Sequence, residues 1–255
     1  MLKHYVKVAL RLIKRSFLFS SINMLGFVVG MTAAFLIYLW IVDELTFEDF
    51  NKNRNEIYRV IKEDTNAPQP ASTVTGLSAF FRESFSKVEN ATFIKYSGKY
   101  GLHFEDKFID AQYAYIDTTF FDVFNFPVVA GDPNLMKQDP QQIVLSEAIA
   151  QKLFGDVSPV GKEVVCTFWN NPRYFKVAAV LKVPRKSHIQ FEVLESWHSY
   201  IQNDRWWKDI KTWYFSERMH VFIQLKKGAT LMEEDRLAFR NSWKEHSDVG
   251  KPVTF

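Results

Sequence analysis

The stretch INMLGFVVGMTAAFLIYLWIV, residues 22–42, decides the architecture of this chain. It is 21 residues long, carries no charge, and has only Asn23 and Thr32 as clearly polar residues. As an α-helix it would rise about 32 Å, and the hydrocarbon core of a bilayer is about 30 Å thick. A buried helix of a soluble protein is rarely this long and apolar. A cleaved signal peptide has a shorter apolar core followed by a small-residue cleavage site, and no such site follows Val42. The stretch therefore predicts an uncleaved transmembrane helix.

The charges on either side of this stretch predict its orientation. Residues 1–21 carry five Lys or Arg and no acid, whereas four acids follow the span closely: Asp43, Glu44, Glu48 and Asp49. By the positive-inside rule, the N-terminus lies in the cytoplasm. Residues 43–255 are then outside, so in a Gram-negative cell the span crosses the inner membrane and the domain is periplasmic.

The leader, residues 1–21, has its own pattern. Its apolar residues recur at helical spacing from Leu2 to Phe17, and Lys3, Lys7, Arg11 and Lys14 share the other face. This pattern predicts a cytoplasmic basic amphipathic helix that lies on the anionic surface of the membrane. A charged flank with no fixed helix is the alternative.

Three small residues, Gly26, Gly30 and Ala34, stand four apart within the span. Such a ladder lets another transmembrane helix approach closely. Glycine and alanine are common in spans, so the motif alone only indicates that this helix has neighbours in the bilayer.

Charge and cysteine content exclude several classes of protein. The net charge is +3 over 255 residues, and the leader alone contributes five positive charges, so the rest of the chain is at −2. A nucleic-acid binder carries a basic face on its folded domain, which this balance does not support. The single cysteine, Cys166, excludes an internal disulfide framework and a Cys-based zinc cluster. It lies in an apolar strand pattern and is expected to be buried and inert.

The part of the chain after the span mixes predicted strands and helices, which indicates an α+β fold. Strand patterns occur at 91–97, 142–146, 163–169, 174–183 and 220–227, with a hairpin in 103–116. Helical patterns occur at 76–87, 147–154, 196–204 and 231–246. Asn170, Asn171 and Pro172 are expected to turn the chain between two strands.

The stretch SEAIAQKLFGDVSPVGKEV, Ser146 to Val164, superficially resembles a phosphate-binding loop. Five residues separate Gly155 from Gly161, one too many, and Glu163 stands where a Ser or Thr should hold magnesium. Ser146 is instead expected to cap a helix, and Gly155 to follow its C-terminus with a positive φ. A nucleotide-binding site is therefore excluded here.

Several stretches, taken in order, resemble the N-terminal part of MacB-like (FtsX-like) ABC transporter permeases of the Bacteroidota type. They cover most of residues 1–195, and their order and spacing are more specific than any single motif. They are SINMLGFVVGM (21–31), where the leader passes into the span, DELTFEDFNKNRNEIYRV (43–60), FFDVFNFPVVAGDP (120–133), IVLSEAIAQKLFGDVSPVGKEV (143–164) and YFKVAAVLKVPRKSHIQFEVL (174–194).

The resemblance implies a particular domain organisation. One transmembrane helix, residues 22–42, would be followed by a mixed α/β periplasmic core domain over residues 43–250. That domain would hold a porter-like subdomain in two parts, about 44–95 and 218–250, with a second subdomain inserted between them at about 96–217.

The resemblance also implies a function. The chain would be a permease component of the mechanotransmission type, which couples ATP hydrolysis by a cytoplasmic partner to export or release of a substrate outside. The implied partners are an ABC ATP-binding subunit, a second permease half or a second copy, membrane lipid, and periplasmic or outer-membrane proteins. No cofactor, no metal and no catalytic residue of its own is expected, because ATP would be used only by the separate subunit.

Permeases of this family have further transmembrane helices after this domain, and residues 43–255 contain no second apolar span. We therefore expect the chain to be a fragment or a truncated form. The alternative is a stand-alone membrane-anchored module that binds or regulates periplasmic partners. A membrane-anchored enzyme is the weakest hypothesis, because no constellation of catalytic residues is found.

Two groups of residues remain as site candidates. His188, in KSHIQF, matches a position of the family, and a structural role at a loop-to-strand junction is preferred over a ligand role, since no other His or Cys stands at metal-ligand spacing. Trp206, Trp207 and Trp213 lie near two lysines and could form an exposed recognition patch, or ordinary core with lysines reaching to solvent.

Overall fold

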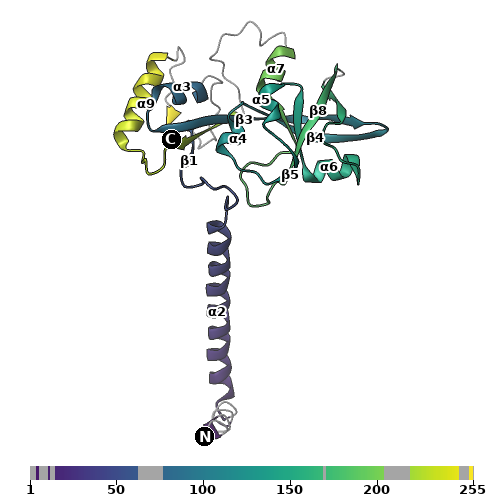
Figure 1. Cartoon of the computed structure of the whole chain (residues 1–255). Helices are drawn as coiled ribbons and strands as arrows, with labels where there is room; N and C mark the ends of the chain where they lie inside the picture. The colour runs from purple at the N-terminus through teal and green to yellow at the C-terminus, as the bar shows by residue number, and fades with distance from the viewer. Residues whose placement is uncertain are drawn as a thin grey trace. The chain divides into compact units, whose positions relative to one another are not determined.

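The computed structural model describes residues 4–5, 11, 15–62, 77–168, 171–203, 219–246 and 253–254 (Figure 1). Most of the predicted amphipathic helix, residues 1–21, lies outside this part. Trp206, Trp207 and Trp213, the predicted recognition patch, lie outside it entirely. Residues up to Phe47 and residues from Glu48 onward form two separate units, which are described one at a time.

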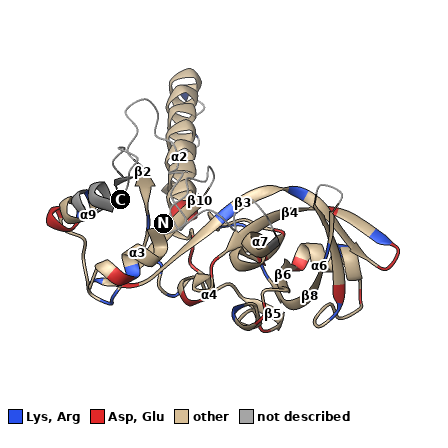
Figure 2. Cartoon of the chain, turned by 90° about the horizontal axis from the view of Figure 1, so that it is seen from above, with Lys and Arg blue, Asp and Glu red and all other residues tan. Residues whose placement is uncertain are grey.

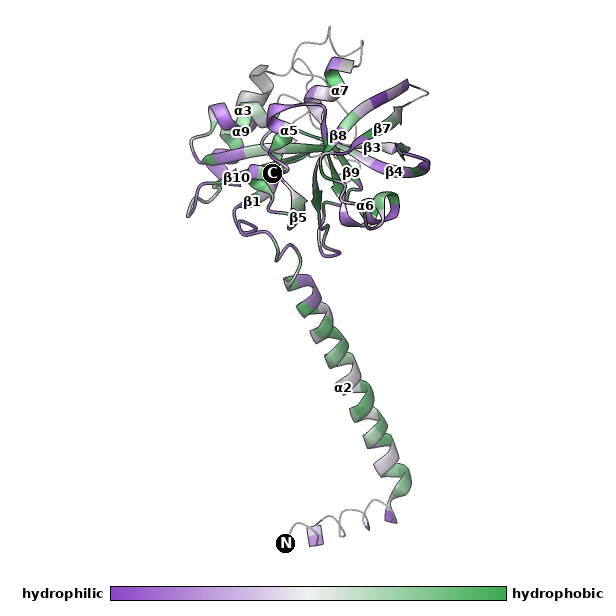
Figure 3. Ribbon diagram, turned by 45° about the vertical axis from the view of Figure 1, so that its right-hand side comes forward, coloured by the Kyte–Doolittle hydropathy of each residue, from purple (hydrophilic) through white to green (hydrophobic). Residues whose placement is uncertain are grey.

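The first unit is dominated by α2, Phe17–Leu45, a helix of 29 residues that contains the whole predicted span. It is the one helix among the described residues that is long and apolar enough to cross a membrane. None of its residues is buried, and Figure 3 colours most of its length as hydrophobic. A helix that is apolar all round needs an apolar environment, which for α2 is the bilayer. It ends where the hydroxyl of Thr46 donates to the carbonyls of Val42 and Asp43, both at 3.0 Å.

The second unit is built on one large sheet. Its hydrogen-bonded order is β1 (Ile57–Arg59), β10 (Met219–Leu225), β3 (Val88–Phe104), β4 (Lys107–Ile116), β9 (Val193–Ser196), β6 (Gln142–Ser146), β8 (Asn171–Leu181) and β5 (Val128–Gly131). A further strand, β7 (Glu163–Phe168), pairs with both β3 and β8. Separately, β2 (Ile61–Lys62) pairs with β11 (Val253–Thr254).

The double pairing of β7 closes part of the sheet into a ring. Going round it, β3, β4, β9, β6, β8 and β7 pair in turn, and β7 pairs back to β3. Every strand of this ring contributes to one buried apolar cluster: Leu102, Tyr113, Val193, Ile143, Val177 and Cys166. Since side chains alternate between the two faces of a strand, the ring encloses its own core.

Helices pack against the ring and against the remainder of the sheet. The ring carries α6 (Glu147–Phe154), whose apolar face joins the ring's core, and α7 (Trp197–Asn203). The short helices α4 (Phe120–Val123) and α5 (Leu135–Gln138) join a second cluster on the other face. At the far end of the sheet, α3 (Leu77–Ser84) and α9 (Glu233–His246) meet through Phe81 and Phe239, whose rings stack at 4.7 Å.

The long strand β3 links these clusters. Its 17 residues supply Phe93 to the cluster under α3 and α9, Ile94 to the second cluster, and Leu102 to the ring. The strand continues into the β3–β4 hairpin, where Figure 2 shows charged residues at the tip. The strand passes through the boundary expected near residue 95, and the proposed division into two subdomains stays a prediction.

The α+β fold predicted from the sequence is confirmed. So is the reading of Ser146 to Gly155: the hydroxyl of Ser146 accepts a hydrogen bond from the amide of Ile149 at 3.3 Å, and Gly155 has φ +62° just after α6. The burial of Cys166 is also confirmed.

The turn expected at residues 170–172 is wrong in part. Asn171 and Pro172 already belong to β8, where they pair with Phe168 and Thr167. Proline lacks an amide donor, but the first residues of a strand tolerate this loss. The short strands β5 and β9 were not predicted, because four residues are too few to show an alternation.

Candidate functional site

Glu48, the first residue of the domain unit, is fastened to the loop between β8 and β9. Its backbone amide donates to the carbonyl of Lys186 at 2.9 Å. Its Oε1 accepts from the hydroxyl of Ser187 at 3.0 Å and from the amide of His188 at 2.6 Å. The His188 Nδ1 lies 3.3 Å from the same oxygen. We call this set of contacts the Glu48 clasp.

The backbone at the clasp is unusual. Glu48 has φ +58°, in the left-handed region that residues with a side chain rarely occupy. Such a conformation costs on the order of 1 kcal/mol and persists where the surroundings hold it. The hydrogen bonds of the clasp supply that restraint. Because the loop from 182 to 192 leads directly into β9, the clasp ties the start of the domain to the ring.

The segment after Glu48 is packed as well. Asn51 is buried, and its amide donates to the Glu48 carbonyl at 2.9 Å, so the chain makes a tight turn. The ring of Phe50 packs against that of Phe126 at 5.1 Å between centroids. The chain that leaves α2 is therefore part of the folded domain within three residues of the helix end.

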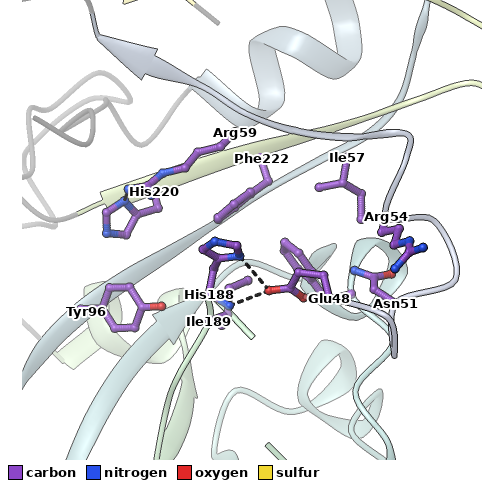
Figure 4. Close-up of a pocket in the computed structure, with 11 residues that line it drawn as sticks. Glu48, Asn51, Arg54, Ile57, Arg59, Tyr96, His188, Ile189, His220 and Phe222 are labelled. Atoms are coloured by element: carbon purple, nitrogen blue, oxygen red, sulfur yellow. Dashed lines mark hydrogen bonds and ion pairs between the residues drawn. The ribbon is translucent and has the colours of Figure 1, made fainter. Parts of the chain in front are cut away.

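A pocket of about 380 Å³ opens beside the clasp (Figure 4). Its apolar lining comes from Ile57 on β1, Phe222 on β10, Phe124 after α4, and Ile189 in the loop before β9. The polar side chains around it include Glu48, Arg59, Tyr96, His188 and His220. Figure 4 shows Arg59 and His220 together at one side of the pocket and Glu48 at another. Five separate segments of the chain thus meet here.

Arg59 and His220 form the basic side of the pocket. An Nη atom of Arg59 is in hydrogen-bond contact with Nδ1 of His220. Burial, with the positive charge of Arg59 as the second cause, lowers the pKa of His220 to about 4. The imidazole is therefore neutral at pH 7. Since a guanidinium can only donate, Nδ1 of His220 accepts and Nε2 carries the hydrogen.

Tyr96 adds a further donor. Its ring packs edge-on to His220 at 5.3 Å, and burial raises the pKa of its hydroxyl, which keeps the phenol protonated. In the described part of the chain, Arg59 forms no ion pair with a carboxylate. On the acidic side, Ser187 and His188 contact Oε1 of Glu48, and Oε2 is buried with no hydrogen-bond partner.

The residues predicted as transmembrane packing sites lie where the sequence placed them. Gly26, Gly30 and Ala34 are all on α2 and exposed. A methyl group added at Gly26 or Gly30 would meet nothing within 4 Å. The ladder is thus available to a neighbouring helix, and its role in packing stays a prediction.

His188 is a partner of Glu48 within the loop between β8 and β9, five residues before β9 begins, and its structural role stays a prediction. Among the described residues, no group of three or more His, Cys, Asp or Glu could hold a metal ion. The thiol of Cys166 lies in the ring core, where burial raises its pKa to about 12, so it stays protonated.

The clasp and the Arg59–His220 contact were missed from the sequence. Glu48 and Ser187 are 139 positions apart, and Arg59 and His220 are 161 apart. The stretches DELTFEDFNKN and KSHIQF each stood out in the family resemblance, but nothing in their spacing indicates that they meet.

An apolar helix joined directly to an α+β domain with a closed ring of strands defines a membrane-anchored protein with a large domain outside the bilayer. The model of the MacB-like periplasmic core domain matches residues 20–234, and the chain therefore belongs to that family. It is a MacB-like ABC transporter permease domain, anchored by α2, with its folded domain in the periplasm. Such a permease component is not an enzyme in the usual sense. No curated protein sequence matched the chain.

Solved structures share the fold. A domain of a permease protein from Porphyromonas gingivalis superposes with a TM-score of 0.65 at 21% identity, covering 80% of this chain and 90% of that one. The periplasmic region of MacB from Actinobacillus actinomycetemcomitans gives 0.57 at 15% identity, covering 81% and 92%. The extracellular domain of the noncanonic ABC-type transporter YknZ from Gram-positive bacteria gives 0.56 at 16% identity, covering 78% and 98%.

Proposed function

We propose that this chain works as the first transmembrane helix and periplasmic domain of an ABC transporter permease of the mechanotransmission type. ATP hydrolysis by a separate cytoplasmic subunit would be coupled to export or release of a substrate outside the membrane. The N-terminus would be cytoplasmic and the membrane would be the inner membrane, in keeping with the basic leader and the acidic residues that follow the span.

The observation that carries this proposal is the Glu48 clasp. A helix can move a domain only if the chain between them does not absorb the motion. Here Thr46 ends α2, and Glu48 is already hydrogen-bonded to Lys186, Ser187 and His188. A shift of α2 would therefore pull on the loop that enters β9, and β9 pairs with β4 and β6 in the ring.

The work assigned to the domain is mechanical, so it needs no catalytic residue and no cofactor of its own. ATP would act only through the partner subunit. The other partners are a second permease half or a second copy, with Gly26, Gly30 and Ala34 as the contact surface within the bilayer, together with membrane lipid. Periplasmic or outer-membrane proteins would meet the domain outside, and nucleic acid has no place in this function.

A pull-down from the native membrane tests the proposal. The chain, expressed from its own locus with an affinity tag, is expected to bring down an ATP-binding subunit whose ATP hydrolysis is measurable in the eluate. A tagged span in which residues 44–255 are removed controls for adhesion to any membrane protein. Recovery of periplasmic partners with no ATP-binding subunit would reject the transporter role and favour a stand-alone anchored module that binds or regulates those partners.

A further inference from the structure

We propose that the pocket beside the Glu48 clasp binds the head group of a single-chain amphiphile that carries both a phosphate and an amine, such as a lysophospholipid with an ethanolamine head group. The proposal concerns the domain's own ligand and does not depend on the ATP-binding partner.

One side of the pocket carries an unmatched positive charge. Arg59 is a guanidinium without a carboxylate partner among the described residues, and the Nε2–H of His220 lies beside it on the same side of the pocket. Arg54 also lines the pocket, but its charge is matched by Asp49, with which it forms an ion pair. A phosphate bound at Arg59 would receive charge-assisted hydrogen bonds, which are the stronger kind. The hydroxyl of Tyr96 is a further donor at this side.

The other side of the pocket holds an acceptor without a donor. Glu48 lines the same pocket, and its Oε2 is buried without a hydrogen-bond partner, which costs free energy until a donor satisfies it. The Glu48 side chain is one-fifth exposed, so an ammonium group in the pocket would match its negative charge, and a rotation of the carboxylate would bring Oε2 to that donor. An anion alone would satisfy only the basic side. A head group with a phosphate at one end and an amine at the other satisfies both.

The lining between these two sides is apolar. Ile57, Phe124, Ile189 and Phe222 make most of the pocket wall apolar. The volume of about 380 Å³ is at the lower end of the range for small-molecule sites, roughly 300–1,000 Å³. There is room for a head group and the first part of one acyl chain.

One lining residue of the pocket, Glu48, follows the membrane span closely in the sequence, and this favours a lipid over a soluble ligand. Glu48 follows Leu45, the last residue of α2, by three positions, and three residues span at most about 11 Å. Chain connectivity therefore keeps this acid close to the end of the span, where lipid head groups are the most abundant amphiphiles.

The test uses the full chain, purified in maltoside micelles, with lysophosphatidylethanolamine added and the bound lipid counted by native mass spectrometry. Lysophosphatidylglycerol has the same phosphate without the amine, and the wild-type chain is expected to retain at least fivefold less of it. Arg59→Gln is expected to reduce the retained ethanolamine lipid about tenfold. Arg236→Gln, which removes an exposed arginine of α9 that pairs with Glu233, is the matched control and should retain the wild-type amount.

Two results would overturn the proposal. Equal retention by the wild-type chain, Arg59→Gln and Arg236→Gln would mean that the lipid adheres to α2 and not to the pocket. Displacement provides a second measurement on the unaltered chain, should Arg59→Gln fail to fold. Soluble phosphoethanolamine is expected to displace the lipid at concentrations at which inorganic phosphate does not. Equal displacement by the two would reject the amine and leave only a free-phosphate site.

Discussion

The guanidinium of Arg173 and the carboxylate of Glu195 form a two-bond ion pair at the ring of strands. Nη1 lies 2.8 Å from Oε1 and Nη2 lies 3.3 Å from Oε2. The pair joins β8 to β9, which do not hydrogen-bond to each other because β6 lies between them. Glu195 is fully buried, and Arg173 also packs over the ring of Phe168 at 3.7 Å. This side-chain pair therefore links two strands of the ring, β8 and β9, that are not neighbours in the sheet.

This pair gives the domain a pH-dependent stability. Burial raises the pKa of Glu195 from 4.5 to about 7, and the attraction of Arg173 only partly offsets this. Between these two values the folded state keeps a proton that the unfolded state releases, so the free energy of unfolding falls as pH rises through the window. The fall is on the order of 1–3 kcal/mol. Denaturant unfolding of the full chain in micelles, from pH 5 to pH 8, measures it.

The control for this prediction is Glu195→Gln. The amide cannot titrate, so the difference in free energy of unfolding between wild type and variant should change with pH in that window. The loss of a charged partner for Arg173 applies only above about pH 7, where the wild-type carboxyl is ionised. A difference that stays constant from pH 5 to pH 8 would contradict the assignment to Glu195.

Glu48→Gln tests the clasp. The amide group accepts more weakly than the carboxylate, and bonds to charged groups contribute about 1.5–3 kcal/mol. We expect a loss of about 2 kcal/mol in the free energy of unfolding, together with loss of any effect of the domain on ATP hydrolysis by the co-purified subunit. Asp49→Asn changes the neighbouring, half-exposed acid and should alter stability by no more than about 0.5 kcal/mol. Equal losses in the free energy of unfolding for the two variants would show that the Glu48 clasp does not stabilise the domain more than Asp49 does.

Gly131 and Gly161 form a matched pair, because both have φ +77°. An added Cβ at Gly131 would lie 2.1 Å from the carbonyl oxygen of Ala178, whereas at Gly161 it would meet nothing within 4 Å. Gly161→Ala should therefore cost only the left-handed conformation, about 1–2 kcal/mol. Gly131→Ala adds a clash with backbone of β8 and should cost at least twice as much. Melting temperatures of the two variants would decide this, and similar values would contradict the close approach of β5 to β8.

Ser146→Ala tests the cap of α6. The side chain of Ser146 accepts from the amide of Ile149, and loss of an N-cap costs about 1 kcal/mol. Ser146→Thr keeps the acceptor and should retain most of the stability. Unfolding in urea distinguishes the two, and a Thr variant as unstable as the Ala variant would mean that buried volume matters here and the cap does not.

Gly30→Ile tests the small-residue ladder of α2. A branched side chain would fill the surface at which another helix is expected to approach, so recovery of partner transmembrane proteins in the pull-down should fall several-fold. Val29→Ile, one position away, leaves the ladder intact and is the control. Unchanged recovery with Gly30→Ile would remove the ladder from the proposed assembly.

Much of the local structure was predictable because its causes are local. The span follows from 21 uncharged residues, and α6 follows from Ser146, four apolar residues at helical spacing and Gly155. Errors arose where the pattern was too short or where the chain context overrode it. Asn171 and Pro172 have turn chemistry, yet their pairing with β7 places them in a strand.

The contacts of the candidate site could not be predicted from the sequence, because they too depend on the context of the fold. Glu48 reads as one of four acids after a span, and His188 as one histidine in a loop. Their contact depends on how β8 and β9 are placed in the sheet, which no spacing along the chain records. The buried ion pair of Arg173 and Glu195 is equally hidden, since Glu195 lies in a strand of four residues.

Composition and neighbours along the chain account for the apolar span and the charge difference across it, the mixture of helices and strands, and the capped helix at Ser146. The closure of the ring by β7, and the meeting of distant polar groups at Glu48 and Arg59, follow from the three-dimensional fold. Burial of apolar side chains drives the collapse without specifying partners. The pairing of strands far apart in the chain then fixes which charged and polar side chains must satisfy one another.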